Sequence, residues 1–411
     1  MIFTNILQKW NNTSLVLRIL GGLIIGVILA LLVPQFDLIS LLGVLFIGAL
    51  KGIAPILVFV LVISALANGK GHGKSIARVV AMYVIGTLAA AVTAVTIFFF
   101  FPVGLSLNGV EAASGYEVAG DVGAVFLGII KDIVINPLAA ITNTNFLGIL
   151  FWAVVFGLAL RKSSDKTKYV ISEIADAVSV VVKWIISFAP FGVLGIVFNA
   201  VSTNGLEIFV NYGQLLALLV GTMAIVALVI NPLIVFVMIR QNPYPLVLKC
   251  LKESFIPAFF TRSSGANIPV NMNLCKSLKL NPNIYSTTIP LGATINMAGA
   301  AITVTIMTLA CVYTLGIQTP FYMQILLCFV AALCACGASG VAGGSLLLIP
   351  LACSLFGVPV EISMQVVGIG FIIGVVQDSC ETGLNSSTDA IFTAASEYHD
   401  WKKEGKEISW K

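Results

Sequence analysis

Long runs of hydrophobic residues alternate with short polar intervals along the whole chain. Runs long enough to span a bilayer, about 20 residues or more, occupy the stretches 15–33, 42–66, 79–102, 122–160, 169–201, 211–239, 283–313 and 362–395. The stretch 122–160 is too long for one helix, and the segment NPLAAITNTN inside it predicts a break at Pro137. The pattern therefore predicts eight transmembrane helices, the fourth of them interrupted.

The polar intervals alternate in charge. Lysine and arginine precede the first span and follow the second, fourth, sixth and last spans (Lys9, Arg18; Lys70, Lys74, Arg78; Arg161, Lys162, Lys166, Lys168; Arg240, Lys249, Lys252; Lys402, Lys403, Lys406). Neither residue occurs in the intervals 34–41, 103–121, 202–210, 314–320 and 357–361. Because short basic loops stay in the cytoplasm, both termini are predicted to be cytoplasmic.

Two further apolar segments break this alternation. Segment 253–275 has basic residues on both sides, whereas neither flank of segment 321–356 contains lysine or arginine. Each segment should therefore enter and leave the membrane on one side, as a re-entrant hairpin that turns in a region rich in Gly and Ser (FFTRSSGANIPVN and CACGASGVAGGSLLLIP). Two hairpins from opposite sides, each followed by a helix, predict an inverted repeat, the arrangement of secondary transporters with binding sites at the membrane midplane.

The composition places the chain in lipid. Of its 411 residues, 59% are hydrophobic and 10% are charged, against about 25% charged residues in soluble domains. The N-terminus MIFTNILQKWNNTS is polar and leads into a full-length span, so no cleavable signal is expected. The net charge of +4 is dispersed over the flanks of the spans and gives no reason to expect nucleic-acid binding. The eight cysteines begin at Cys250 and lie mostly in apolar runs, as buried thiols do. We expect an all-α polytopic membrane protein.

The last span carries a stripe of polar side chains in the segment QDSCETGLNSSTD. At about 100° per residue, Asp378, Thr382, Asn385 and Asp389 project within about 60° of one another, and Glu381 lies at the edge of the same stripe. Because charge in hydrocarbon is costly, this face should be covered by protein. It predicts a site for cations and a polar ligand. The alternative is that these residues join helices or pair with a basic group, for which Arg262 is the nearest candidate in apolar surroundings.

The seventh span offers cation ligands of a second kind. In PLGATINMAGAAITVTIM, the residues Gly292, Asn296 and Gly299 interrupt an apolar run. Glycine weakens a helix, so we expect a locally unwound segment whose free carbonyls can coordinate a cation. The alternative is that these glycines serve close helix packing.

The tips of the two hairpins offer backbone donors. Ser263 and Ser264 in the first tip and residues 340–344 in the second lie where two short helices turn. Backbone N–H groups at the N-termini of half-helices suit a carboxylate. The alternative is ordinary turn chemistry.

Three motifs carry a resemblance to a known family. FFTRSSGANIP, PLGATINMAG and D-x-x-x-T-x-x-N-x-x-x-D, in this order, are similar to signature segments of the dicarboxylate/amino acid:cation symporter family, which includes the excitatory amino acid transporters. The similarity covers nearly the whole chain, including KGIAPILVFVLV and APFGVLGIV. Within the family, the chain most resembles the bacterial serine/threonine:sodium symporters.

The resemblance implies a homotrimer with an elevator fold, in which part of each chain moves against a fixed scaffold. The scaffold would comprise 1–78 (helices 1 and 2) and 103–201 (helices 4 and 5). The transport domain would comprise 79–102 (helix 3) and 202–411, which contains helix 6, the first hairpin, helix 7, the second hairpin, helix 8 and a cytoplasmic tail.

The resemblance also implies site residues. In the substrate site, Asp378 would take the ammonium group of the substrate, and the whole set would be Arg262, Ser263, Ser264, Val341, Ala342, Gly343, Asp378, Glu381, Thr382 and Asn385. One sodium site would contain the carbonyl of Gly292 with Asn296, Asn385 and Asp389. A second would contain Thr294, Ala335, Cys336 and Ala338, largely through carbonyls.

Two departures from the family pattern shape the functional expectation. Glu381 stands where members that carry acidic substrates have an arginine, which argues against glutamate or aspartate as the substrate. Ala298 stands where members with the most sodium sites have an aspartate, so a third site would have only neutral oxygens such as those of Tyr83 and Thr87. Glu381 itself has three interpretations: it accepts a hydrogen bond from a hydroxyl group, it is protonated, or Arg262 holds it.

The expected function is sodium-coupled uptake of small neutral amino acids, serine and threonine first, across the inner (plasma) membrane of a bacterium. The nearest alternative is sodium- or proton-coupled uptake of acidic amino acids or dicarboxylates by the same fold. The GASG segment at 337–340 resembles a serine-protease motif, but such chemistry needs a general base beside the serine. Both His72 and His399 lie outside the spans, so we do not expect an enzyme.

Overall fold

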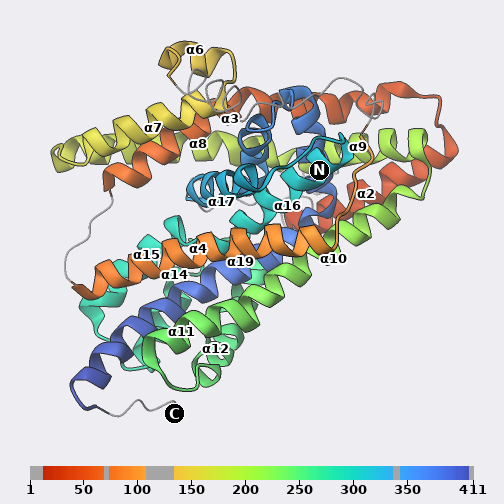
Figure 1. Cartoon of the computed structure of the whole chain (residues 1–411). Coiled ribbons are helices and arrows are strands. Elements are labelled where there is room, and N and C mark those ends of the chain that lie inside the picture. Colours follow the sequence, from red (N-terminus) through yellow and green to blue (C-terminus); the bar gives the residue numbers. More distant parts are fainter. Residues whose placement is uncertain (1–12, 69–73, 108–133, 337–342, 407–411) are drawn as a thin grey trace, which may run out of the picture.

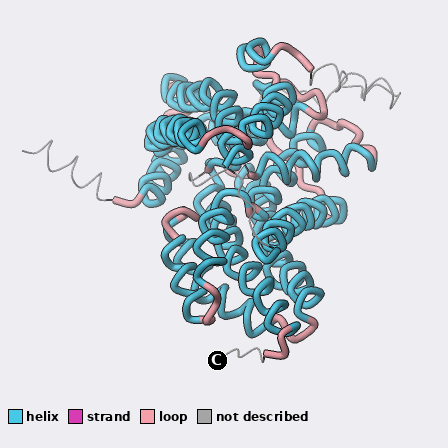
Figure 2. Tube along the Cα trace, turned by 90° about the vertical axis from the view of Figure 1, so that its left-hand side faces the viewer, coloured by secondary structure: helices cyan, strands magenta, loops and turns pink. Residues whose placement is uncertain are grey.

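The computed structural model describes residues 13–68, 74–107, 134–336 and 343–406. Every regular element in these ranges is a helix, and Figures 1 and 2 show helices joined by short loops. The all-α prediction is therefore confirmed for the part of the chain that the structure describes.

The N-terminal half of this part contains α2 (Leu15–Leu32), the 3₁₀ turn η1 (Asp37–Ile39), α3 (Ser40–Asn68), α4 (Lys74–Phe100), α6 (Pro137–Thr142), α7 (Phe146–Leu160), α8 (Asp165–Ser187) and α9 (Ala189–Asn204). The C-terminal half contains α10 (Ile208–Ile225), the π-helical turn η2 (Val226–Ile230), α11 (Asn231–Ile239), α12 (Tyr244–Cys250), the π-helical turn η3 (Leu251–Phe255), α13 (Ile256–Thr261), α14 (Ile268–Ser277), α15 (Pro282–Ile295), α16 (Ala298–Thr314), α17 (Phe321–Ala335), the 3₁₀ turn η4 (Gly344–Leu348), α18 (Ile349–Ser354) and α19 (Val360–Lys403).

Several of these helices are long and apolar enough to cross a membrane. Within the described ranges they are Asp37–Asn68, Lys74–Phe100, Ile208–Ile239, Pro282–Thr314 and Val360–Lys403. They correspond to the second, third, sixth, seventh and eighth predicted spans. Shorter apolar helices cover the first span, part of the fourth and the second hairpin (Leu17–Leu32, Gly148–Leu160, Phe321–Ala335 and Gly344–Ser354). The chain is a multi-pass membrane protein.

Proline decides where two of the predicted spans break. In the fifth, α8 and α9 meet at an angle of 51° instead of forming one helix. Pro190 lies in the first turn of α9, where it has no N–H with which to continue the helix from α8. In the fourth, α6 begins at Pro137 as predicted, with the side chain of Asn136 accepting from two backbone N–H groups. The chain turns again before α7, and residues 122–133 lie outside the described ranges.

The seventh span is interrupted where Gly292, Asn296 and Gly299 predicted an unwound segment. The helix α15 ends at Ile295 and α16 begins at Ala298. Between them, Asn296 has φ −96° and ψ 82°, outside the helical region, and its N–H donates to the Gly292 carbonyl at 2.9 Å. This break allows polar side chains to reach the middle of an otherwise apolar span.

The first predicted hairpin has a helix–turn–helix form. Its first arm runs from Tyr244 through η3 to Thr261, so it begins earlier than the predicted 253, and its second arm is α14. Arg262 makes the turn with a left-handed backbone (φ 51°). The two arms lie side by side. The Asn267 amide, just before α14, donates to the Ser254 carbonyl in η3 at 3.2 Å. In the second hairpin, α17 is followed by η4 and α18, and the tip at 337–342 lies outside the described residues.

The helices pack in two groups. In the first, α2, α3, α7, α8 and α9 contact mainly one another; in the second, α4 and the elements from α10 to α19 do so (Figure 1). The centre of the second group is α19, whose 44 residues give a length of roughly 66 Å. This exceeds a hydrocarbon core of about 30 Å, so α19 extends beyond the membrane.

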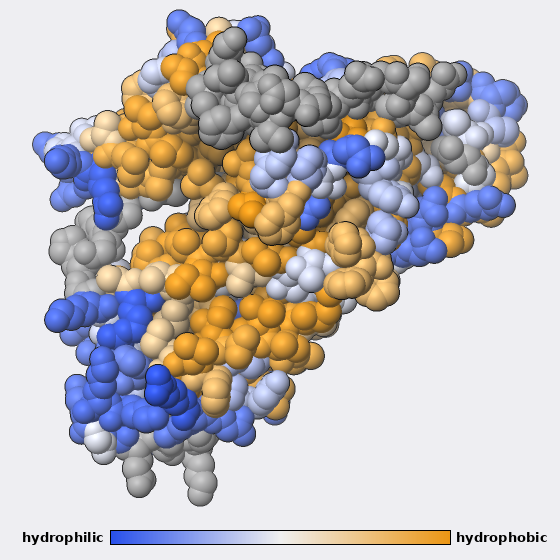
Figure 3. All heavy atoms as spheres, viewed as in Figure 1, coloured by the Kyte–Doolittle hydropathy of each residue, from blue (hydrophilic) through white to orange (hydrophobic). Residues whose placement is uncertain are grey.

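The C-terminal end of α19 gathers the polar ends of other helices. Asp400 pairs with Arg78 at the start of α4 at 2.8 Å, and the Lys402 ammonium donates to the Ile239 carbonyl at the end of α11 at 3.1 Å. The Glu397 carboxylate accepts from the Asn281 N–H beside α15 at 2.7 Å. Figure 3 shows this end as a hydrophilic region below an apolar surface. Arg78 and Lys402, which belong to two of the basic flanks predicted to be cytoplasmic, thus lie at the same end of the second helix group.

Candidate functional site

The polar stripe of α19 is covered by protein along its whole length. Asp378, Glu381, Thr382, Asn385 and Asp389 are all buried. Most of their hydrogen-bond partners come from the first hairpin, from the break between α15 and α16 with the α16 helix that follows it, and from the second hairpin around η4. Three elements distant in sequence therefore converge on one face of one helix.

Asp378 is held from both hairpins. The Arg262 Nε atom, at the turn of the first hairpin, lies 2.6 Å from Asp378 Oδ2, and both side chains are nearly inaccessible, with 9% and 4% of their surfaces exposed. The Gly343 N–H of the second hairpin donates to Oδ1 at 3.1 Å. Arg262 Nη2 also donates to the Gly374 carbonyl at 3.3 Å. The carboxylate therefore joins the two hairpins through one buried ion pair and one backbone donor.

Glu381 accepts hydrogen bonds from hydroxyl groups, which is the first of its three interpretations. Thr303 Oγ1 donates to Glu381 Oε2 at 2.7 Å and Ser345 Oγ donates to the same atom at 2.9 Å. The Gln377 Nε2 atom is a third donor, at 2.6 Å. The guanidinium of Arg262 makes its ion pair with Asp378. A methyl group at Gly299 would lie 2.8 Å from the Glu381 carbonyl, so α16 approaches α19 closely here.

Asn385 and Asp389 meet the break in the seventh span. The Gly299 N–H at the start of α16 donates to Asn385 Oδ1 at 2.7 Å. The Asn296 amide donates to Asp389 Oδ1 at 2.8 Å and to the Asn385 carbonyl at 3.3 Å. The unwound segment therefore forms one polar cluster with Asn385 and Asp389, the C-terminal part of the stripe.

This cluster contains oxygen atoms of the kind that hard cations bind. Asn296 Oδ1 is buried and has no hydrogen-bond partner among the described residues, which is costly unless a ligand compensates it. The nitrogen of the same amide donates to the Asp389 carboxylate. A methyl group at Gly292 would overlap Asp389 Oδ1 and approach the Tyr83 hydroxyl to 2.8 Å. Only glycine lets this backbone come so close, and carboxylate, amide and carbonyl oxygens are the ligands of hard cations.

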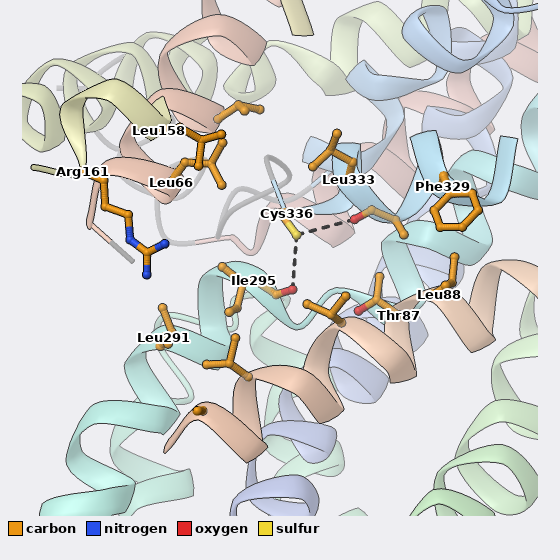
Figure 4. A pocket seen from close by; sticks show the side chains of 15 residues that line it. Leu66, Thr87, Leu88, Leu158, Arg161, Leu291, Ile295, Phe329, Leu333 and Cys336 are labelled. Atoms are coloured by element: carbon orange, nitrogen blue, oxygen red, sulfur yellow. Dashed lines mark hydrogen bonds between the residues drawn. The ribbon is translucent and has the colours of Figure 1, made fainter. Parts of the chain in front are cut away.

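The residues proposed for the second cation site also lie near one another. Cys336, at the end of α17, donates through its Sγ atom to the Ile295 carbonyl at the end of α15, at 3.5 Å (Figure 4). Thr294 is next to Ile295, and Ala335 precedes Cys336; the Thr294 hydroxyl donates to the Leu291 carbonyl at 2.7 Å. The second hairpin thus meets the unwound segment. Ala338 lies outside the described residues.

The hairpin tips are described in part. Ser264 is buried, and Ser263 Oγ accepts from the Ala266 N–H at 3.2 Å. Gly343 has φ 72°, a conformation that favours glycine, and donates to Asp378 as above. Val341 and Ala342 lie outside the described residues, as does the GASG segment.

A comparison with known protein families identifies the family of this chain. Residues 15–398 match the model of the sodium:dicarboxylate symporter family. The chain belongs to this family. The resemblance carried by its three motifs is confirmed.

Individual members of the family are similar over their whole length. The serine/threonine transporter SstT of Streptococcus thermophilus (strain ATCC BAA-250 / LMG 18311) is 52% identical over 398 residues, covering 97% of this chain and 99% of that protein. The protein of the same name from Streptococcus agalactiae serotype III (strain NEM316) is 56% identical, covering 95% and 97%. The one from Enterococcus faecalis (strain ATCC 700802 / V583) is 54% identical, covering 98% and 95%. These relatives are named as transporters, in agreement with the expectation of no enzymatic activity.

Two groups of site residues in this symporter were missed by sequence reasoning. One is the set of donors around Glu381, namely Thr303, Ser345 and Gln377. The other joins the first hairpin to α19: the Asn267 amide donates to Ser386 Oγ at 2.7 Å and the Asn271 amide to the Ser386 carbonyl at 2.9 Å. Asparagine and glutamine inside apolar segments are the signal that could have found part of this set.

A cavity of about 710 Å³ lies away from the stripe of this symporter, between its two helix groups. Leu66, Leu158 and Arg161 line it from the first group, and Leu291 and Phe329 are among the residues that line it from the second (Figure 4). Its wall is almost wholly apolar, and none of the stripe residues contributes to it. The polar chemistry is therefore concentrated in the stripe rather than in this cavity.

Proposed function

We propose that this chain is a sodium-coupled symporter that takes up small neutral amino acids, principally serine and threonine, across the inner (plasma) membrane of a bacterium. The names of relatives more than half identical over nearly the whole chain support the substrate. The observation that carries the proposal is the charge of the stripe: Asp378 and Glu381 lie one turn apart on a buried helix face.

A zwitterionic substrate fits this charge pattern. Its ammonium group would bind Asp378 in place of Arg262. Its carboxylate would bind backbone N–H groups of the tips around Ser264 and Gly343 together with the Asn385 amide, without a second formal charge on the protein. The remaining proposed substrate contacts are Ser263, Thr382, Val341 and Ala342. The structure describes Ser263 and Thr382, whereas Val341 and Ala342 belong to the tip outside the described ranges.

Sodium is the proposed coupling ion. Asp389, Asn296, the Asn385 oxygens and the Gly292 carbonyl would hold one ion, and Thr294 with Ala335, Cys336 and Ala338 would hold a second. The buried Asn296 Oδ1, which lacks a partner among the described residues, supports the first site. A cation there would neutralise Asp389 in a region where an isolated carboxylate is costly. Cation binding at this site would therefore depend on the geometry of the unwound segment.

The helix groups support an elevator mechanism. We propose that α2, α3, α7, α8 and α9 form the scaffold and trimer interface, and that α4 with α10 to α19 form the transport domain. The chain would have eight transmembrane helices, two re-entrant hairpins and cytoplasmic termini. Between the groups, Lys51 on α3 pairs with Glu361 on α19 at 2.6 Å, with 35% and 72% of the side chains exposed. Such an exposed pair contributes at most about 1 kcal/mol, so it would not prevent movement.

The alternative is symport of acidic amino acids or dicarboxylates, as the description of the family suggests. A second substrate carboxylate would need a cation near Glu381, but the described partners of Glu381 are hydroxyl and amide groups. The stripe therefore favours neutral substrates.

Uptake into proteoliposomes tests the proposal. Purified protein should accumulate labelled serine when an inward sodium gradient is imposed, and excess threonine should compete. A proton gradient without sodium is the control for the driving ion. Accumulation of aspartate in preference to serine, or serine uptake that ignores the sodium gradient, would refute it.

A further inference from the structure

The carboxylate of Glu381 is fixed by three donors from three elements. Thr303 belongs to α16, Ser345 to η4 in the second hairpin, and Gln377 to α19 itself. All three donate to Oε2, at 2.7, 2.9 and 2.6 Å respectively. Gln377 Nε2 also donates to Thr303 Oγ1 at 2.7 Å, which closes a ring of hydrogen bonds. A side chain held in this way cannot turn freely.

The second oxygen of Glu381 is left for a ligand. Oε1 accepts no hydrogen bond from the described residues, although the side chain that carries it is otherwise fully bonded. The accessible part of the cluster also belongs to Glu381, which is 5% exposed, whereas its three donors are at most 1% exposed. The cluster thus presents one preoriented acceptor.

The spacing of the two acidic residues suits a β-hydroxy amino acid. Glu381 follows Asp378 by three residues, so the two side chains are neighbours on the helix, with about 5–6 Å between their Cβ atoms. In serine and threonine, the ammonium and the hydroxyl group are on adjacent carbons. One ligand can therefore donate to both carboxylates.

We propose that Glu381 Oε1 accepts the β-hydroxyl of the substrate and thereby distinguishes serine and threonine from alanine, with Thr303, Ser345 and Gln377 as positioning residues. This inference rests on the proposed uptake of neutral amino acids. A hydrogen bond from the substrate hydroxyl to a charged acceptor is stronger than one between neutral groups. Alanine lacks this hydroxyl and would leave the carboxylate of the site without a partner. These two effects predict that serine is preferred to alanine by about 10- to 100-fold in affinity.

Competition in proteoliposomes measures this preference. Sodium-driven uptake of labelled serine, and separately of labelled alanine, is measured with increasing amounts of either unlabelled amino acid. The inhibition curves give the serine-to-alanine affinity ratio of each protein. In Glu381→Gln, the serine-to-alanine affinity ratio should fall from at least about tenfold to within about threefold. The loss should appear in the apparent KM for serine rather than in the KM for alanine.

The positioning role has its own test with matched variants. Thr303→Val removes a donor to Oε2 and should lower the ratio, whereas Thr303→Ser keeps the hydroxyl and should restore it. Thr305→Val is the control: Thr305 lies on the same helix, is equally buried, and its hydroxyl has no partner among the described residues. Should Glu381→Gln fail to fold, this series decides the question.

An unchanged ratio in Glu381→Gln, or equal ratios in Thr303→Val and Thr303→Ser, would overturn the inference. So would a wild type that transports serine and alanine with equal affinity, a result that leaves the proposed function intact. Absence of sodium-driven uptake of any neutral amino acid by the wild type would refute the proposed function and this inference together.

Discussion

Arg262 at the turn of the first hairpin is paired with Asp378 on α19, with 2.6 Å between Nε and Oδ2. The protein's own cation thus neutralises the carboxylate that we propose for the substrate ammonium. A substrate that binds Asp378 must take the place of this guanidinium, so the hairpin and the ligand compete for one anion.

The first prediction concerns this competition. Arg262→Ala leaves Asp378 buried without its cation and should destabilise the ligand-free protein by about 3–5 kcal/mol. Serine with sodium should then raise the melting temperature of the variant more than that of the wild type, because the substrate ammonium replaces the missing partner.

Thermal unfolding in detergent, with and without serine and sodium, checks this prediction. Lys406→Ala is the control, because Lys406 pairs with Glu404 at the same 2.6 Å but with 61% and 56% of the side chains exposed. Its effect should stay below about 1 kcal/mol. An equal ligand shift in Arg262→Ala and the wild type would contradict the competition.

The second prediction removes the ammonium anchor. Asp378→Asn has nearly the same shape but no charge, so uptake of every amino acid tested should fall to the background level. Asp400→Asn is the matched control, because Asp400 lies on the same helix and pairs with Arg78 far from the stripe. Labelled uptake into proteoliposomes is the measurement, and full serine uptake by Asp378→Asn would remove Asp378 from the site.

The third prediction concerns cation coupling. Asp389→Ala removes the only carboxylate of the first proposed sodium site, so uptake should be nearly abolished and its dependence on sodium should weaken. The control is Ser387→Ala on the same helix, since the Ser387 hydroxyl donates only to carbonyls of its own helix. Sodium activation curves are the measurement, with expression matched by immunoblot. Near-normal activation in Asp389→Ala would exclude this assignment.

The fourth prediction concerns substrate charge. A second carboxylate within about 4 Å of Glu381 would be repelled by about 4 kcal/mol at an effective dielectric constant of about 20, or roughly a thousandfold in affinity. Excess aspartate should therefore compete poorly with labelled serine. Glu381→Arg should weaken serine uptake and increase competition by acidic ligands. Strong competition by aspartate in the wild type would disprove the neutral-substrate proposal.

The fifth prediction concerns the hairpins. Lys276 and Gln318 are both exposed; Lys276 lies in the last turn of α14, at the end of the first hairpin, and Gln318 follows the seventh span. In a background without the native cysteines, Lys276→Cys should react with a membrane-impermeant thiol reagent only from the cytoplasmic side, and Gln318→Cys only from outside. Lys276 is preferred to Lys279, whose φ of 58° would strain a cysteine. Labelling of both from one face would refute the re-entrant topology.

The sequence by itself determined the class of the protein and the position of its polar chemistry. Hydrophobic runs, the Gly–Asn break in the seventh span and the stripe from Asp378 to Asp389 are local patterns. Each has a local cause: the length needed to span lipid, the weakness of glycine in a helix, and the cost of exposing charge to hydrocarbon. The break at Asn296 and the burial of the stripe follow from these causes, and the structure has both.

The tertiary structure alone decided which polar groups meet. Arg262 is available to either acidic residue in sequence terms, and it pairs with Asp378, 116 positions away. Thr303 and Ser345 reach Glu381 across 78 and 36 positions. These pairings depend on how α16 and the two hairpins dock on α19, including the close approach at Gly299, and no local pattern encodes the register between elements that are far apart in the chain.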